Sequence, residues 1–206
     1  MTIETALIAF VAAASLLTIT PGLDTAMVLR TAAVEGPRTA ALAALGIILG
    51  CLAWGAAVAL GLTALLGASQ LAYLGLKWAG AAYLAWLGVG LILKPRSRLD
   101  LAGAAPAAVG NWWLRGFLTN LLNPKVGVFY ISFLPQFVPA HFAAAPFIFL
   151  LAAIHGVLGA VWFAALIAAT SPLKRWLART AVVRWIDRVT GIVFIGFGLR
   201  LALDRR

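Results

Sequence analysis

Long apolar stretches dominate the chain, and short stretches of charged and turn-forming residues separate them. The apolar stretches approach the ~20 residues that an α-helix needs to cross a bilayer. Backbone inside a bilayer must satisfy its own hydrogen bonds, and these runs are too long for the strands of a membrane barrel. The pattern therefore predicts an all-α polytopic membrane protein with six spans, at roughly 4–29, 39–66, 71–93, 113–136, 144–170 and 185–203.

Composition agrees with this pattern and narrows the function. The 206 residues are 64% hydrophobic, whereas a soluble domain is usually about half apolar. We therefore expect one transmembrane domain over 1–206 and no separate soluble domain. Cys51 is the only cysteine, which excludes an intramolecular disulfide and a two-cysteine electron relay. The chain has two histidines, too few for a His-rich metal site, so we predict no bound metal. We also assign no catalytic residue.

The net charge of +10 could indicate a nucleic-acid partner, but its distribution argues against one. Most basic residues fall in the short loops on one side of the predicted membrane, which the positive-inside rule makes cytosolic. Both termini then lie outside, although the basic C-terminal pair opposes this orientation. The basic residues of the predicted cytosolic side are Arg30, Arg38, Lys94, Arg96, Arg98, Arg115, Lys174, Arg175, Arg179, Arg184 and Arg188.

Two prolines interrupt the first and fourth spans, and a charged residue follows each. The first break reads TPGLD at 20–24, and the second reads NPK at 123–125. Pro21 lies nine residues before Arg30, and Pro124 lies nine residues after Arg115. At ~1.5 Å per residue both breaks lie ~13 Å from the same face, near the middle of the membrane. A charge at this depth is costly and marks a functional site by default.

The chain also resembles a doubled unit. The two prolines lie 103 residues apart, half the length of the chain, and the same offset carries the second span onto the fifth. A repeat of three spans must invert in the membrane, because three is odd. We therefore predict an inverted 3+3 repeat, a known transporter plan, with repeat 1 at 1–93, a linker at 94–111 and repeat 2 at 112–206.

The breaks could bind a zwitterion such as an amino acid. Thr20 and Asn123 are residue types that cap helix N-termini, and proline suits the first helical position. Each break could thus begin a half-helix whose N-terminus attracts an anion. Asp24 would bind the ammonium group, and Lys125 the carboxylate. The predicted substrate-binding residues are Asp24, Lys125, Asn120, Asn123, Thr20, Pro21, Gly22 and Pro124. Alternatively, Asp24 and Lys125 pair with each other or with backbone carbonyls, and the prolines are plain kinks.

Two further features of the spans can be interpreted from the sequence. Gly46 and Gly50 form a GxxxG pattern, which favours helix packing. His155 within the fifth span fits either a proton relay or a hydrogen-bonded packing residue.

The sequence motifs carry a family likeness. The TPGLD segment followed by Arg30 resembles the first-helix signature of the LysE/RhtB family of amino-acid exporters. The segment GFLTNLLNPK at 116–125 and FLPQF at 133–137 resemble its fourth-helix signature. One departure is Leu23, where many relatives have a second proline.

The resemblance implies a bacterial inner-membrane exporter of amino acids or their derivatives, driven by the proton motive force and without a cofactor. Family substrates include lysine, arginine, threonine, homoserine, leucine and cysteine-pathway compounds, and this sequence does not rank them. We expect alternating access around a midplane site, with a protonation change, Asp24 being the best candidate, coupled to release. Alternatives are a channel, an exporter of another small solute or ion, and a membrane protein that transports nothing. The oligomeric state stays open, with a homodimer as one option.

Overall fold

The computed structural model describes residues 2–20, 22–68, 70–95, 111–139, 142–169 and 179–203. Within these ranges the chain forms α-helices and one 3₁₀-helix, and contains no strand. The elements are α1 (Ile3–Ile19), α2 (Leu23–Val34), α3 (Pro37–Ala68), α4 (Gln70–Leu93), α5 (Trp112–Leu121), α6 (Pro124–Phe133), η1 (Leu134–Phe137), α7 (Ala144–Ala168) and α9 (Thr180–Leu203). The predicted all-α class is confirmed.

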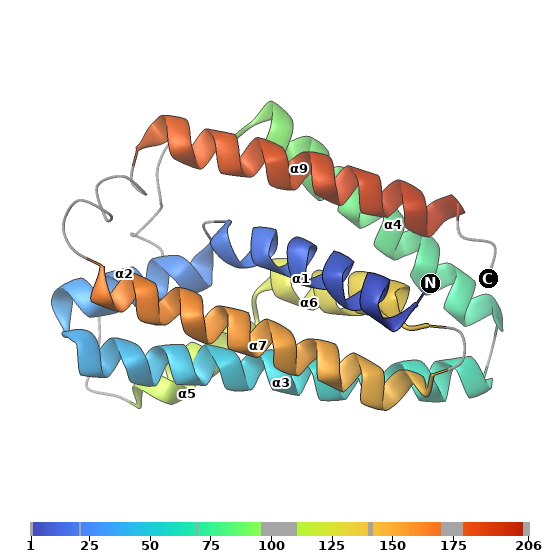
Figure 1. Ribbon diagram of the computed structural model, residues 1–206, viewed down its shortest axis with the longest axis horizontal. Helices are drawn as coiled ribbons and strands as arrows, with labels where there is room; N and C mark the ends of the chain where they lie inside the picture. The colour runs from blue at the N-terminus through green and yellow to red at the C-terminus, as the bar shows by residue number, and fades with distance from the viewer. Residues whose placement is uncertain are drawn as a thin grey trace.

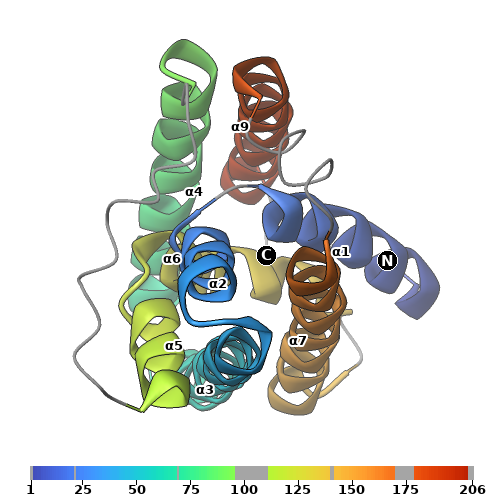
Figure 2. The ribbon, with the colours of Figure 1, turned by 90° about the vertical axis from the view of Figure 1, so that its left-hand side faces the viewer.

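The helices run along the long axis of an elongated bundle, and their directions alternate (Figure 1). The α1–α2 pair runs from right to left in that view, α3 returns, and α4 runs from right to left again. The α5–α6 pair, α7 and α9 repeat this alternation in the opposite sense, and both termini lie at the right-hand end. Seen end-on, α4 and α9 stand side by side at one edge of the bundle, away from α3, α5 and α7 (Figure 2).

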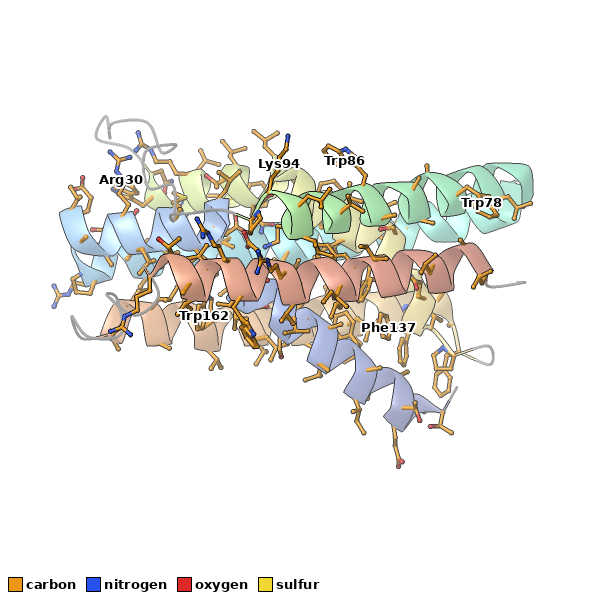
Figure 3. All side chains as sticks on the ribbon, turned by 90° about the horizontal axis from the view of Figure 1, so that it is seen from above. Arg30, Trp78, Trp86, Lys94, Phe137 and Trp162 are labelled. Carbon is orange, nitrogen blue, oxygen red and sulfur yellow. The ribbon has the colours of Figure 1, made fainter. Side chains whose placement is uncertain are left out.

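Helices occupy all six predicted spans. Two of them, α3 over Pro37–Gly61 and α7, are long and apolar enough to cross a membrane. The helices α1 and α2 qualify together as a third span, bent by 51° at the break between them. The outer face of α4 carries large exposed aromatic side chains, with Trp78 57% and Trp86 69% exposed (Figure 3). Such a surface suits contact with lipid. Most of the predicted linker, 96–110, lies outside the described residues.

The first break differs from the prediction in one respect. Thr20 does not cap α2; it ends α1, and its hydroxyl donates a 2.5 Å hydrogen bond to the Leu16 carbonyl. Gly22, in extended conformation, is the residue that precedes α2. The N-cap prediction for Thr20 is therefore wrong. The physical reason is that a threonine hydroxyl can bond the carbonyl four residues back, which competes with capping the next helix.

The second break follows the prediction. The Asn123 Oδ1 atom accepts a 3.1 Å hydrogen bond from the Lys125 backbone N–H, and Pro124 is the first residue of α6. At its far end α6 gives way to η1 at Leu134, so the predicted span to 136 changes helix type before it ends. Pro135 accounts for the change, because it removes a backbone donor and clashes with the preceding turn.

Small residues bring the helix backbones into contact. A Cβ atom on Gly46 of α3 would overlap the Trp113 carbonyl of α5, and one on Gly116 of α5 would overlap the Ala43 carbonyl of α3. Close approach through small residues is the usual way in which membrane helices associate. The packing interpretation of Gly46 is therefore confirmed.

Candidate functional site

The two breaks lie against each other, and Asp24 bridges them. Asp24 is the second residue of α2. Its Oδ2 atom accepts a 2.8 Å hydrogen bond from the Asn120 side-chain amide, and its Oδ1 atom accepts one of 3.3 Å from that of Asn123. Both amides belong to the second break, at the end of α5 and the start of α6. The carboxylate of one break is thus held by side chains of the other.

Lys125 makes the reciprocal connection from the second break to the first. It is the second residue of α6. Its Nζ atom donates to the backbone carbonyls of Thr20 at 3.1 Å and Leu17 at 3.3 Å, at the end of α1. Helix ends leave their last carbonyls without helical partners and carry partial negative charge, so a cation is stabilised there. A Cβ atom on Gly22 would lie 3.4 Å from Nζ, so the glycine leaves room for the ammonium group.

Surrounding contacts hold these groups in place. The Thr20 and Thr190 hydroxyls lie 2.5 Å apart and are buried, which ties the first break to α9. Asn120 is fully buried, and a Cβ atom on Gly50 would lie only 2.6 Å from its Oδ1 atom. Gly50 therefore makes the space that Asn120 needs to reach Asp24. The Asn120 Oδ1 atom has no hydrogen-bond partner among the described residues.

A cavity of about 50 Å³ lies between the breaks and the α3 and α7 helices. One water molecule needs about 10–15 Å³ by this measure, so the space holds several water-sized groups. One wall is polar and comes from the two breaks. The α3 and α7 helices contribute further lining residues, which include Ile47, Ile48, Gly156 and Phe163. Among the described residues, no three His, Cys, Asp or Glu side chains come together in a way that could hold a metal ion.

Most of the predicted site residues line this cavity; two do not, and one lies outside the described residues. Five of them line it: Thr20, Gly22, Asp24, Asn123 and Lys125. Asn120 reaches Asp24 without forming part of the cavity wall, and Pro124 begins α6. Pro21 lies outside the described residues. Of the open alternatives, the bonding of Lys125 to backbone carbonyls is what the structure shows.

Sequence reasoning singled out His155 but did not place α7 at the site. His155 lines the cavity, and its Nδ1 atom lies 2.9 Å from the hydroxyl of the fully buried Tyr130. Gly156 and Gly159 line the cavity beside it. The signal for these residues was their spacing, since Gly159 lies four residues after His155 and three after Gly156, and both spacings place residues on one face of a helix. The interpretation of His155 as a hydrogen-bonded residue is confirmed.

Comparison with known proteins places the chain in a family. Residues 15–205 match the LysE type translocator family. A membrane protein of Pseudomonas aeruginosa, itself uncharacterized, is 35% identical, with 88% of each chain covered. The threonine efflux protein of Salmonella typhi is 31% identical over 90% of this chain and 91% of its own. The leucine efflux protein of Klebsiella pneumoniae is 30% identical over 88% of this chain and 87% of its own. No solved structure matches.

The family match covers nearly the whole described chain, including both breaks and the α7 helix. The match and the efflux relatives confirm the resemblance read from the two break motifs. The chain therefore belongs to the LysE type translocator family and is a membrane transporter rather than an enzyme.

Proposed function

We propose that this protein is a secondary-active exporter of amino acids or their derivatives in the bacterial inner membrane. The observation that carries the proposal is one carboxylate and one ammonium group, Asp24 and Lys125, at the wall of a single intramembrane cavity. An amino acid carries the complementary pair of charges, on an ammonium and a carboxylate group bonded to the same carbon atom. Relatives named as threonine and leucine efflux proteins support the same substrate class.

Binding would exchange hydrogen bonds that the protein now makes internally. The substrate ammonium group would take up the Asp24 carboxylate, in place of or beside the Asn120 and Asn123 amides. The substrate carboxylate would accept from Lys125, in place of the Leu17 and Thr20 carbonyls. A charge-assisted hydrogen bond is about twice as strong as a neutral one, which favours this exchange. The N-terminal turn of α2 opens on the same cavity and would add a favourable dipole.

Reciprocal contacts support the finer proposal of six spans in an inverted repeat, 1–93 and 112–206. A Cβ atom on Gly88 would lie 2.6 Å from the Gly191 carbonyl oxygen, and one on Gly191 would lie 2.6 Å from that of Gly88. The first Cβ would also lie 2.8 Å from Ile195 Cγ1, and the second 2.8 Å from Ile92 Cγ1. The members of both pairs, 88 with 191 and 92 with 195, lie 103 residues apart, as the prolines do. Such symmetry is expected where two inverted repeats cross.

The site contacts follow the same offset. Lys125 bonds residues 17 and 20, and Asp24 bonds residues 120 and 123, which are those positions advanced by 103. Each charged residue therefore binds the opposite repeat, so rocking one repeat against the other would break both sets of contacts. We propose alternating access by this motion, with the basic loops cytosolic and a change in Asp24 protonation coupled to release.

Counterflow in proteoliposomes tests the proposal. Purified protein in vesicles loaded with an unlabelled amino acid mixture is expected to accumulate labelled amino acid, saturably and faster when a proton gradient is imposed. Empty vesicles and vesicles with heat-unfolded protein serve as controls. A large ohmic conductance without saturable counterflow would instead support the channel alternative.

Cys51 provides an independent measure of substrate occupancy. It lines the cavity, it is only 6% exposed, and it is the one cysteine of the chain. We expect N-ethylmaleimide to label the protein slowly and a transported amino acid to slow the labelling further, because both compete for one space. Mass spectrometry of the intact protein measures the modified fraction, and Cys51→Ser controls for reaction elsewhere. Labelling that every transported amino acid leaves unchanged would place the substrate outside this cavity.

A further inference from the structure

Gly156 and Gly159 on α7 are glycines of a different kind from those that pack the helices. Both are buried, yet a Cβ atom on Gly156 would meet only Ile48 Cγ2, at 3.4 Å, and one on Gly159 only Phe163 Cε2, at 3.8 Å. Both distances allow ordinary van der Waals contact. At Gly50, by contrast, a Cβ atom would lie 2.6 Å from Asn120 Oδ1. Packing therefore requires glycine at Gly50 but not at these two positions.

The space in front of the two glycines is part of the cavity. Gly156, Gly159 and the two side chains that a new Cβ would meet all line it. The absence of a Cβ at both positions thus widens the cavity along α7. A substrate held at its ammonium and carboxylate groups by the breaks would direct its third substituent, the side chain, toward this wall.

The chemistry of the wall defines what it can accept. Ile47, Ile48 and Phe163 make it apolar. His155 adds one polar edge, and its Nδ1 atom lies 2.9 Å from the Tyr130 hydroxyl. Asp24 is the one carboxylate among the described residues of the cavity wall, and the substrate ammonium would occupy it. A second substrate cation would therefore be buried without a counter-charge, which is strongly unfavourable.

We infer that the α7 wall, defined as His155, Gly156 and Gly159 with Ile48 and Phe163, is the side-chain subsite and selects neutral amino acids. Side chains from the size of threonine to that of leucine suit an apolar wall with one polar edge, and the two glycines provide their space. Basic amino acids, which the sequence left open, are disfavoured by the charge balance. This inference rests on the proposed function, since it assigns the third substituent of the same substrate.

The test adds one methyl group at a time to the wall. Gly156→Ala and Gly159→Ala are expected to fold, because the new Cβ has room and alanine is the better helix former. A single methylene in an apolar pocket discriminates by about 10–200-fold. We expect the ratio of kcat/KM for leucine to that for alanine to fall at least about tenfold in each variant, while transport of alanine is retained. Counterflow with labelled leucine, alanine and lysine measures the ratios.

A matched control separates size selection from any effect of alanine on a helix. Gly61 in α3 is exposed, is not part of the cavity wall, and has no atom within 4 Å of an added Cβ. Gly61→Ala should leave the leucine-to-alanine ratio within about twofold of wild type, well inside the smallest change expected for a cavity methyl.

Three outcomes would overturn the inference in distinguishable ways. Counterflow of no amino acid by the wild-type protein removes the proposed function, and the inference with it. Wild-type counterflow with an unchanged ratio in Gly156→Ala and Gly159→Ala removes the subsite alone. Lysine transported by the wild type as efficiently as leucine removes the selection of neutral side chains, and this comparison needs no variant to fold.

Discussion

Replacement of Asp24 by asparagine is expected to reduce amino-acid export at least about 30-fold without unfolding the protein. Asparagine has nearly the same size, and its carbonyl oxygen can still accept a hydrogen bond from Asn120 or Asn123. What disappears is the negative charge that would hold the substrate ammonium group. Loss of one partner of a buried, hydrogen-bonded charge pair costs about 2–5 kcal/mol, and about 1.4 kcal/mol corresponds to a factor of ten. Initial rates of counterflow across a range of substrate concentrations measure the loss.

The control for Asp24→Asn replaces an acidic residue at the other end of α2. Glu35 follows the last residue of α2, is exposed, and does not line the cavity. Glu35→Gln should therefore export normally. Replacing Lys125 would be harder to interpret than replacing Asp24. The Lys125 ammonium group also donates hydrogen bonds to the Leu17 and Thr20 carbonyls, so its loss would destabilise the first break as well as remove the charge. Wild-type export by a folded Asp24→Asn variant, verified by size-exclusion chromatography, would remove Asp24 from the site.

The positions of the breaks and of their charges could be predicted from the sequence because the signals are local. Proline disrupts a helix wherever it lies inside one, and a charge within an apolar run is visible without neighbours. The start of α6 at Asn123 and Pro124 followed from the same local rules. The role of Thr20 did not follow from these rules, because a threonine hydroxyl can either cap the following helix or bond a carbonyl of the preceding turn. The structure has the second arrangement, in which Thr20 also meets Thr190 of α9.

The sequence could not predict that the charged residue of each break bonds groups of the other break, since these contacts depend on how distant helices pack. From the sequence, Asp24 and Lys125 were assigned to the two charged ends of a substrate, and the structure adds that each also bonds groups of the opposite break. The glycines pose the same difficulty. Gly46 in α3 and Gly156 in α7 both lie in apolar helices, but the first touches the backbone of α5 and the second faces the cavity. Only the identity of the neighbouring atoms separates a packing glycine from one that makes space.

The contact of α3 with α5 links folding to the site. The α5 helix carries Asn120 at its inner end, and Gly50 of α3 leaves the room that this side chain occupies. The packing of α5 against Gly46 and Ala43 of α3 therefore determines where the Asn120 amide lies relative to the Asp24 carboxylate. Any change that separates the two helices should weaken the site as well as the fold.

Gly46→Ala is accordingly expected to lower both the thermal stability and the export rate. The new Cβ would overlap the backbone of Trp113, which cannot turn away as a side chain could, so α5 must shift. Overpacking of this kind costs about 1–3 kcal/mol or more, and ~1 kcal/mol shifts the melting temperature of a chain of this size by about 2–4 °C. We expect a decrease of roughly 2–12 °C, measured by thermal unfolding in detergent, and a loss of counterflow as Asn120 moves from Asp24.

Two comparisons make this prediction specific to the helix contact. Gly61→Ala on the same helix meets no atom within 4 Å and should melt no lower than wild type. Gly116→Ala disturbs the same contact from the side of α5, where its Cβ would overlap the Ala43 carbonyl. Because neighbouring sites that share one displacement are not additive, the double variant with Gly46→Ala should lose less stability than the two single losses together. Equal melting temperatures for Gly46→Ala and Gly61→Ala would show that the approach of α3 and α5 does not limit the fold, and that the position of Asn120 is set by the second break alone.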